Sequence, residues 1–432
     1  MEKRYMKFLR KGLEYAVYLL AFCLPWQTKL ILRPAATNFT AISLYGSQLL
    51  LLLILIVFFI YKLRRQEPDE PMSWLWGALA GLELSVLLSF FFAIDQLLAF
   101  YYYLLLLEGI GLFYLLREGL TFSGYEDAAL DRIKVIYSFF AGLFLQAILG
   151  VYQFLTQSTI VSKYFGLAPH DPSVAGTSVI VTASGRWLRA YGGMDNPNIF
   201  GGVLALSLLI AAYLLAKKKM IRSQSELGES LVLFVFYFVT LFALFFTFSR
   251  AAWLAFAAAL IYLAVILIRQ GDRWVIGRFA ALVFFSLVMT FIVAYPYRDL
   301  VSVRATDNTP LEQQSINQRQ EYFGQAFSLI KDHYLFGVGV GNYTLVLEQQ
   351  DKSAHNIWDY QPVHNVFMLI WSESGIFALF FFLAFLVLLK KDSRWELSGP
   401  ILLGLIILML FDHWLFSLPF GLLFLFWVSG LL

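Results

Sequence analysis

The sequence predicts an all-α integral membrane protein with about twelve transmembrane helices, and three observations support this fold class. Hydrophobic residues make up 60% of the 432 residues and charged residues only 14%, against roughly 45–50% and about 25% in ordinary globular proteins. Apolar runs of about 18 residues or more recur along the chain. Lysine and arginine gather in alternate connections between these runs. The composition excludes a soluble enzyme, because the polar residues are too few to cover so much apolar surface.

The apolar runs define the expected helices in order along the chain. We expect spans at about residues 13–26, 41–61, 74–93, 97–116, 133–155, 198–215, 231–248, 251–268, 278–296, 364–389, 400–411 and 413–430. The first span is short and contains Pro25, and only Asp412 and His413 separate the last two. Basic residues precede the first span and no small-residue cleavage site follows it, so we expect an anchor rather than a removed signal peptide.

The distribution of positive charge predicts the orientation of the spans. With the amino terminus inside and the spans alternating, the inside segments hold about 21 of the 32 Lys and Arg residues in roughly 77 positions. The outside segments hold the remainder at a density roughly threefold lower. Lys217, Lys218 and Lys219 mark the clearest inside connection. Both termini are therefore expected in the cytoplasm, and residues 1–432 are expected to form a single polytopic domain.

Two long outside connections remain, at residues 156–197 and 297–363. Loops of this length in a compact protein are usually functional or disordered. In the second connection, Arg319 lies in a helical pattern at about residues 312–334, and the glycine-bearing stretch 337–341 after it is expected to be flexible. The helical pattern gives one apolar stripe, formed by Ile316, Phe323, Phe327, Ile330 and Tyr334.

Arginines are the most informative charged residues of the outside face. Arg186 and Arg189 precede the sixth span, Arg250 lies in a tight turn between the seventh and eighth spans, and Arg319 faces inward on the loop helix. A guanidinium donates two parallel hydrogen bonds to phosphate and stays charged at any workable pH, so several of them can neutralise a diphosphate without a metal ion. The alternative is that these side chains extend to the interface or into water. That alternative is least favourable for Arg250, which has hydrocarbon on both sides.

His364 is the candidate catalytic base, because it begins the tenth span at the outer interface and is followed by Asn365. A neutral imidazole near pH 7 is well matched to removing a proton from an attacking hydroxyl. The same position also suits an interfacial hydrogen-bonding residue. Glu83, Glu108 and Glu373 lie within expected spans, where a carboxylate is either functional or paired with a neighbouring helix.

Several kinds of site are absent from the sequence. There is no P-loop, so ATP-driven transport is unsupported. No Cys/His or His/Glu spacing matches a structural zinc site or a metalloprotease, so we expect neither a metal ion nor a cofactor. The net charge of +3 without a dense basic arm excludes a nucleic-acid binder. Cys23 is the single cysteine and is expected to serve in packing.

Four ordered motifs resemble those of the O-antigen ligase and polymerase superfamily. They span about residues 185–390, whereas the first 180 residues show only compatible hydropathy. In order, the motifs are Gly193-Met194-Asp195-Asn196-Pro197-Asn198, Ser249-Arg250-Ala251-Ala252-Trp253, Phe336-Gly337-Val338-Gly339-Val340-Gly341-Asn342, and His364-Asn365 followed by Glu373-Ser374-Gly375.

The resemblance implies a metal-independent, inverting glycosyltransferase of GT-C-like fold in a bacterial inner membrane. Such enzymes move a glycan from undecaprenyl diphosphate to an acceptor hydroxyl at the periplasmic face, so both outside connections would be periplasmic loops. Carried over residue by residue, His364 would be the general base, and Arg189 and Arg250 would hold the diphosphate. Arg186 and Arg319 are further expected contacts of the diphosphate.

The alternatives to an O-antigen ligase are a polymerase, a transporter of lipid-linked glycan and, least favoured within the superfamily, a protein-glycosylating member. A ligase would use the lipid A–core sugar as acceptor, and the first alternative is a polymerase that uses the end sugar of another lipid-linked repeat. The second is a transporter of lipid-linked glycan, in which Glu83 and Glu108 would be ion sites. Paired helix breaks are not evident, and the polar residues concentrate in outside loops, which disfavours the transporter. The expected partners are the lipid-linked donor, the acceptor glycan and membrane lipids, and the sequence does not predict an oligomeric state.

Overall fold

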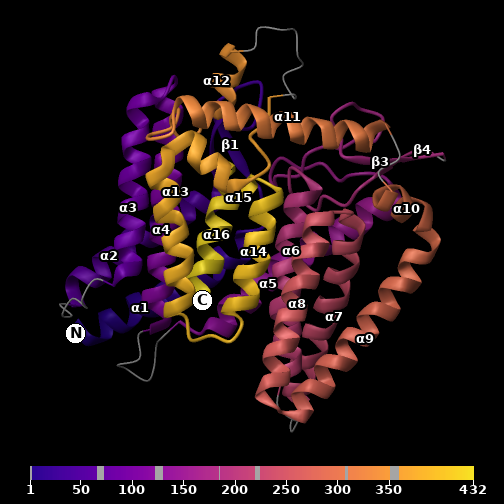
Figure 1. Ribbon diagram of the computed structural model, residues 1–432. Helices are drawn as coiled ribbons and strands as arrows, with labels where there is room; N and C mark the ends of the chain where they lie inside the picture. Colours follow the sequence, from indigo (N-terminus) through magenta and orange to yellow (C-terminus); the bar gives the residue numbers. More distant parts are fainter. Residues whose placement is uncertain are drawn as a thin grey trace. The chain divides into compact units, whose positions relative to one another are not determined.

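The structure is a computed structural model that describes residues 2–65, 73–121, 130–183, 185–218, 224–306, 310–350 and 360–432. This part of the chain is mostly helical (Figure 1). Its α-helices are α1 (Glu2–Cys23), α2 (Gly46–Arg65), α3 (Trp74–Ser89), α4 (Gln96–Thr121), α5 (Arg132–Thr156), α6 (Pro197–Lys217), α7 (Gln224–Thr247), α8 (Arg250–Gln270), α9 (Arg273–Ala294), α10 (Arg298–Thr306), α11 (Pro310–Asp332), α12 (Tyr343–Gln350), α13 (Val366–Asp392), α14 (Ser398–Phe411), α15 (Trp414–Ser417) and α16 (Pro419–Leu431). Two short 3₁₀ helices, η1 (Phe90–Phe92) and η2 (Tyr295–Tyr297), extend α3 and α9.

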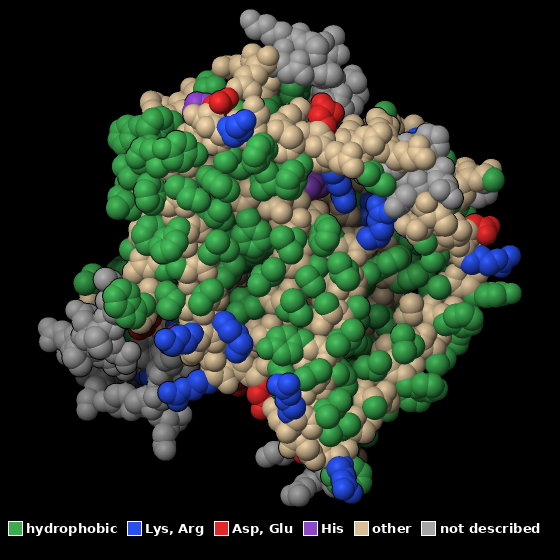
Figure 2. Space-filling model, in the orientation of Figure 1, with side chains coloured by type: hydrophobic (Ala, Val, Ile, Leu, Met, Phe, Trp, Pro, Cys, Tyr) green, Lys and Arg blue, Asp and Glu red, His purple; other side chains and the backbone are tan. Residues whose placement is uncertain are grey.

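The chain is a polytopic membrane protein. Among the described residues, nine helices are long and apolar enough to cross a membrane. Each expected span overlaps a helix, but α1, α14 and α16 do not meet that standard. Charged residues interrupt α1, whereas α14 with 14 residues and α16 with 13 are shorter than the roughly 20 residues that a span needs. In Figure 2, apolar side chains cover the outward sides of the helices and Lys and Arg gather near helix ends.

The chain divides into two compact units. The first contains Met1–Gly142, Arg319–Ser393 and Asp412–Leu432. Within it α13 packs along α3 and α16 packs along α4 (Figure 1). Aromatic side chains fill this core: the rings of Phe139 and Trp427 stack with their centroids 4.2 Å apart.

The second unit contains Leu143–Gln318 and Arg394–Phe411. Its central helix is α6, which packs against α7, α8, α9 and α14. Every side chain of residues 199–212 is buried, because this stretch is apolar on all sides and neighbours surround it. At the carboxyl-terminal end of α6, Lys217 forms an ion pair with Glu396 at 2.9 Å.

Two antiparallel hairpins were not expected from the sequence. β1 (Lys29–Arg33) pairs with β2 (Ile42–Tyr45), and β3 (Val179–Thr182) pairs with β4 (Gly185–Leu188). The expected span at 41–61 is therefore wrong at its start, where a strand precedes the helix. An apolar strand that runs directly into an apolar helix leaves no polar boundary for a sequence to show.

Helix α11 lies where the sequence indicates an amphipathic helix, but only part of the predicted stripe is buried. Ile330 is buried as expected, together with Tyr322, Ala326 and Leu329, whereas Phe323 and Phe327 are more than half exposed. The prediction was wrong at these two positions because aromatic residues occupy both faces of this helix, and spacing alone selected the outer one.

Helix α13 is broken at Gly375, whose φ of 81° and ψ of 179° lie outside the helical region. The break leaves two carbonyl groups without helical partners. The amide of Val338 donates to the carbonyl of Ser372, and the amide of Gly339 donates to that of Glu373, both at 2.9 Å. The chain after α11 therefore fills the break with its own backbone.

The stretch 337–341 is buried and tightly packed, so the expectation of a flexible passage is wrong. At Gly341, with φ of 71°, an added Cβ would lie 2.1 Å from the ring of Tyr102. At Gly375, an added Cβ would lie 2.0 Å from the carbonyl oxygen of Leu335. These glycines allow a left-handed backbone and close approach, which is a different use of glycine from flexibility.

Candidate functional site

His364 occupies a defined position at the start of α13. Asn365 is the N-cap of that helix, and its side-chain oxygen accepts a hydrogen bond from the amide of Met368 at 3.0 Å. An asparagine in this role fixes where the helix begins. The histidine–asparagine pair of the sequence is therefore a helix start that holds the imidazole just outside the membrane-spanning segment.

His364 lies among aromatic and ionisable side chains of the first unit. Its ring meets the ring of His413 edge to face at a centroid distance of 5.0 Å and stacks on Tyr322 at 5.9 Å. The nearest polar atoms of His364, Asp412 and His413 all lie within 4.8 Å of one another. Among the described residues the Nδ1 atom of His364 is buried and has no hydrogen-bond partner. One nitrogen of this imidazole therefore makes no hydrogen bond within the described part of the chain.

His413 is held more firmly than His364. Its Nδ1 atom lies 2.6 Å from the Ser417 hydroxyl, and its amide donates to the Asp412 carboxylate at 2.8 Å. The ring of Phe39, from the β1–β2 connection, packs on His413 at 5.3 Å. The hydroxyl of Tyr102 donates to the carbonyls of both Phe39 and Ser417 at 3.0 Å. Several segments therefore fix the imidazole next to His364.

Both histidines are neutral at pH 7. The pKa of His364 is lowered to about 3, chiefly by burial away from water and also by His413 and Arg319, against the negative charge of Asp412. Burial also lowers the pKa of His413, again against the charge of Asp412. A neutral imidazole can accept a proton, and Asp412 is the group that stabilises the cation formed when it does.

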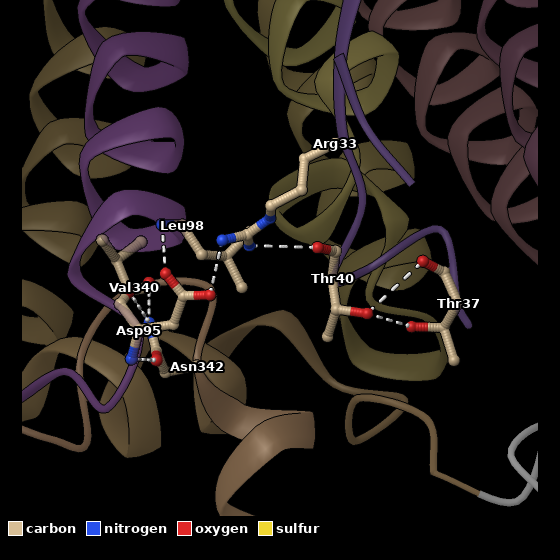
Figure 3. A network of polar contacts seen from close by, with 7 residues as sticks. All are labelled: Arg33, Thr37, Thr40, Asp95, Leu98, Val340 and Asn342. Atoms are coloured by element: carbon tan, nitrogen blue, oxygen red, sulfur yellow. Dashed lines mark hydrogen bonds and ion pairs between the residues drawn. The ribbon is translucent and has the colours of Figure 1, made fainter. Parts of the chain in front are cut away.

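A polar network fixes the backbone around this cluster (Figure 3). Arg33 at the end of β1 forms an ion pair with Asp95 at 2.7 Å and donates to the carbonyl of Thr40 at 3.3 Å. Asp95 accepts from the amide of Leu98 at 2.9 Å at the start of α4, and its own amide donates to Asn342 at 2.7 Å. The network joins the loop that carries Phe39 to the glycine stretch before α12.

The same three residues are the metal candidate of the described chain. His364, Asp412 and His413 each offer one ligand atom, and imidazole nitrogen with carboxylate oxygen suits Zn²⁺. Arg319 adds a positive charge that acts on both histidines, and a nearby cation disfavours a bound metal ion. The metal-ligand spacings expected in a sequence do not reveal this group. His364 lies before the start of α13, whereas Asp412 and His413 follow the end of α14.

The second unit holds Arg189, which is buried with 7% of its surface exposed. Its Nε donates to the carbonyl of Thr247 at 2.6 Å, and its Nη2 donates to the Asn198 side chain at 2.8 Å. Asn196 caps α6 by accepting from the amide of Asn198 at 2.8 Å, and Pro197 takes the first helical position. The Asn-Pro-Asn motif therefore starts a helix and orients an arginine toward the end of α7.

Arg250 and Arg304 meet at the turn between α7 and α8. Phe248 in that turn has φ of 48°, an uncommon backbone for a bulky residue. Arg304 on α10 donates to its carbonyl from Nη2 at 2.9 Å and from Nε at 3.2 Å. Arg250, the first residue of α8, donates to the carbonyl of Arg304 at 3.4 Å. With Arg189 on Thr247, three arginines from three segments converge on one turn.

This arginine cluster (Arg189, Arg250 and Arg304) lies at the amino terminus of α8. The N-cap residue, Ser249, makes no side-chain capping hydrogen bond. The first amides of a helix and its dipole attract anions. Guanidinium groups next to such a terminus are suited to phosphate, because both features favour negative charge at the same place.

The structure sorts the predicted residues into groups. It places His364 near Arg319 in the first unit and Arg189 near Arg250 in the second. Arg186 joins neither, because its exposed side chain donates to the backbone of the first loop at Pro172 and, at 3.5 Å, at Val174. His355 and Lys219 lie outside the described residues.

Sequence reasoning missed four residues of these groups: Tyr322, Asp412, His413 and Arg304. The one available signal was the Asp412-His413 pair between two short apolar helices, since ionisable residues at such a place are functional candidates. The sequence interpretation treated the pair only as an interruption.

The three membrane-embedded glutamates have partners. Glu108 accepts from the Gln48 side chain at 2.8 Å, and Glu83 accepts from the Tyr103 hydroxyl at 3.3 Å. Glu373 is buried and accepts from the Tyr343 amide at 3.4 Å, beside the break in α13. Each contact ties a carboxylate to a neighbouring element, which is a structural use of the group.

Residues 233–383 match the family model described as O-antigen ligase. The match confirms the resemblance found in the sequence over this region, which contains Arg250, Arg304, Arg319 and His364. It ends before Asp412 and His413. No curated protein matches the chain.

Proposed function

We propose that this membrane protein transfers a glycan from undecaprenyl diphosphate to an acceptor sugar hydroxyl, because residues 233–383 match the O-antigen ligase family model. The observation that carries the proposal is the cluster of His364, Asp412 and His413, in which His364 at the start of α13 lies inside the matched region. The preferred acceptor is lipid A–core, as the sequence resemblance implies for a ligase. The alternative acceptor, the end sugar of a second lipid-linked repeat, would make the protein a polymerase.

In the proposed reaction His364 is the general base. The acceptor hydroxyl attacks the anomeric carbon of the donor and its proton passes to the imidazole of His364. The bond between that carbon and the diphosphate oxygen breaks, undecaprenyl diphosphate leaves with the bonding electrons, and the linkage is inverted. Asp412 offsets the positive charge that His364 gains, and His413 keeps the base in place.

The diphosphate is assigned to the arginine cluster (Arg189, Arg250 and Arg304). Arg250 and Arg304 are proposed to bind its oxygens together with the first amides of α8. Arg189 is given the supporting role of fixing the α7–α8 turn, since its Nε and Nη2 donate to Thr247 and Asn198. Guanidinium groups then neutralise the charge that a divalent metal ion neutralises in many other transferases. Arg319 is assigned to the acceptor or donor near His364, and Arg186 to the fold of the first loop.

The break in α13 argues against the transporter alternative. Broken helices in transporters leave backbone groups free to bind substrate or ions. Here the amides of Val338 and Gly339 donate hydrogen bonds to the carbonyl groups that the break leaves without helical partners. Glycan transfer therefore remains the better use of the residues around Gly375.

The orientation of the loops can be tested by thiol labelling. Donors of this class are presented at the periplasmic face, so the proposal requires both long loops there and the α8–α9 turn in the cytoplasm, as the charge distribution predicts. In a Cys23→Ser background, Ala175→Cys and Gln314→Cys should react with a membrane-impermeant reagent in spheroplasts, and Arg273→Cys only after lysis. All three positions are exposed. Labelling in the reverse order would contradict the donor assignment.

A further inference from the structure

A groove with a volume of about 250 Å³ lies between α1 and α2 of the first unit, and none of the residues assigned above lines it. Phe8, Gly12 and Ala16 line it on one side, and Leu50 and Leu53 line it on the other. These α1 residues recur every four positions, so they form one stripe along the helix. The groove is apolar throughout its described wall.

Small residues open the groove. A Cβ added to Gly12 would meet no atom within 4 Å, so space lies directly above this position. Phe8, one turn earlier, is 75% exposed. An open apolar channel beside an exposed aromatic ring is suited to a hydrocarbon chain rather than to water.

A basic stripe borders the groove. Lys7 and Lys11 are exposed and lie one turn apart on α1, directly beside Phe8 and Gly12 in sequence. Arg64, near the end of α2, is also exposed. Glu14, which also lies on α1, accepts a hydrogen bond from Tyr18 at 2.8 Å. Positive charge beside an apolar groove at a membrane surface favours lipids with anionic headgroups.

From this arrangement we infer that the α1–α2 groove binds one acyl chain of an anionic glycerophospholipid, with the headgroup phosphate at Lys7 and Lys11. The charge complementarity selects this occupant over a neutral phospholipid. Helix α1 is not one of the nine described helices that are long and apolar enough to cross a membrane. A bound lipid is consistent with this composition. A bound lipid would cover the apolar stripe that α1 and α2 leave open.

Native mass spectrometry of the purified full-length protein tests this inference, with phosphatidylglycerol and phosphatidylcholine as the two probes. Wild type should retain phosphatidylglycerol preferentially. Gly12→Leu should abolish that retention, because the leucine fills the groove, and leucine also favours the helix. Lys7→Gln and Lys11→Gln should each weaken phosphatidylglycerol binding about fivefold and leave phosphatidylcholine binding unchanged.

The matched control is Gly77→Leu on α3, where an added Cβ also meets nothing within 4 Å. It should bind phosphatidylglycerol like wild type. Equal retention of both lipids by wild type, or full retention of phosphatidylglycerol by Gly12→Leu, would overturn the inference. The lysine variants keep the test decisive if Gly12→Leu folds poorly. None of these residues is assigned to glycan transfer, so this readout is independent of the proposed reaction.

Discussion

Replacement of His364 by alanine is expected to lower the rate of glycan transfer by about 10²–10⁴-fold, the usual cost of removing a general base. Donor binding should stay close to wild type, because the diphosphate is assigned to Arg250 and Arg304. Transfer rates and donor binding of the purified variant are the two measurements. Retention of most activity would remove His364 from the reaction.

The control for this variant is His333→Ala. His333 is exposed and follows α11 directly, so its loss should leave transfer unchanged. His355 provides a second comparison, since it begins the other histidine–asparagine pair of the sequence. An essential His355 with a dispensable His364 would place the base in the second loop.

The pH dependence of transfer follows from the lowered pKa of His364. The base form is the neutral imidazole, and with a pKa of about 3 it stays neutral well below the ordinary histidine value of about 6.5. The profile of kcat/KM should therefore remain flat between pH 8 and about pH 5, and fall only at lower pH. Asp412→Asn removes the charge that raises this pKa, so it should slow transfer at neutral pH and shift the acid limb lower. A wild-type midpoint near pH 6.5 would contradict the buried environment.

Arg250→Ala is expected to reduce transfer by about 10²–10³-fold, the typical loss when one donor to developing negative charge is removed. Arg250→Lys should be nearly as poor, because lysine keeps the charge but lacks the planar fork that binds phosphate with two hydrogen bonds. Donor affinity should weaken in both variants while protein levels hold. The measurements are donor binding and kcat/KM for the donor.

The control is Arg269→Lys, at the exposed carboxyl-terminal end of the same helix. It should behave like wild type. Arg304→Lys should resemble Arg250→Lys if both guanidiniums hold the diphosphate. Near-complete rescue by lysine at 250 would show that only positive charge is needed there.

The helices were predictable from the sequence because long apolar runs leave few alternatives in a membrane protein. All expected spans overlap helices, and Asn196 and Asn365 cap α6 and α13 as such residues commonly do. The strand Ile42–Tyr45 was not predictable, because it continues into α2 without a polar boundary. The buried face of α11 was partly mispredicted for a related reason: Phe323 and Phe327 satisfy helical spacing but face outward.

Residues of the candidate site were predictable only where they stand in a local sequence motif. His364 and Arg250 stand in local motifs, so their importance is visible in the sequence. His413 and Arg304 reach their partners through tertiary packing, from segments remote in the chain, and sequence spacing says nothing about such contacts. The rigidity of residues 337–341 was hidden because the same glycines suit a flexible loop and a close backbone contact equally well.

The most direct test of the account is product formation by the purified wild-type protein from a lipid-linked repeat in EDTA, with and without lipid A–core. We predict one transfer onto core, release of undecaprenyl diphosphate, and no loss of rate in the chelator. Chain extension without core would establish the polymerase alternative within the same chemistry. Activity lost in EDTA and restored by Zn²⁺ would contradict the account and make His364, Asp412 and His413 metal ligands, and the absence of any new glycosidic bond would contradict glycan transfer altogether.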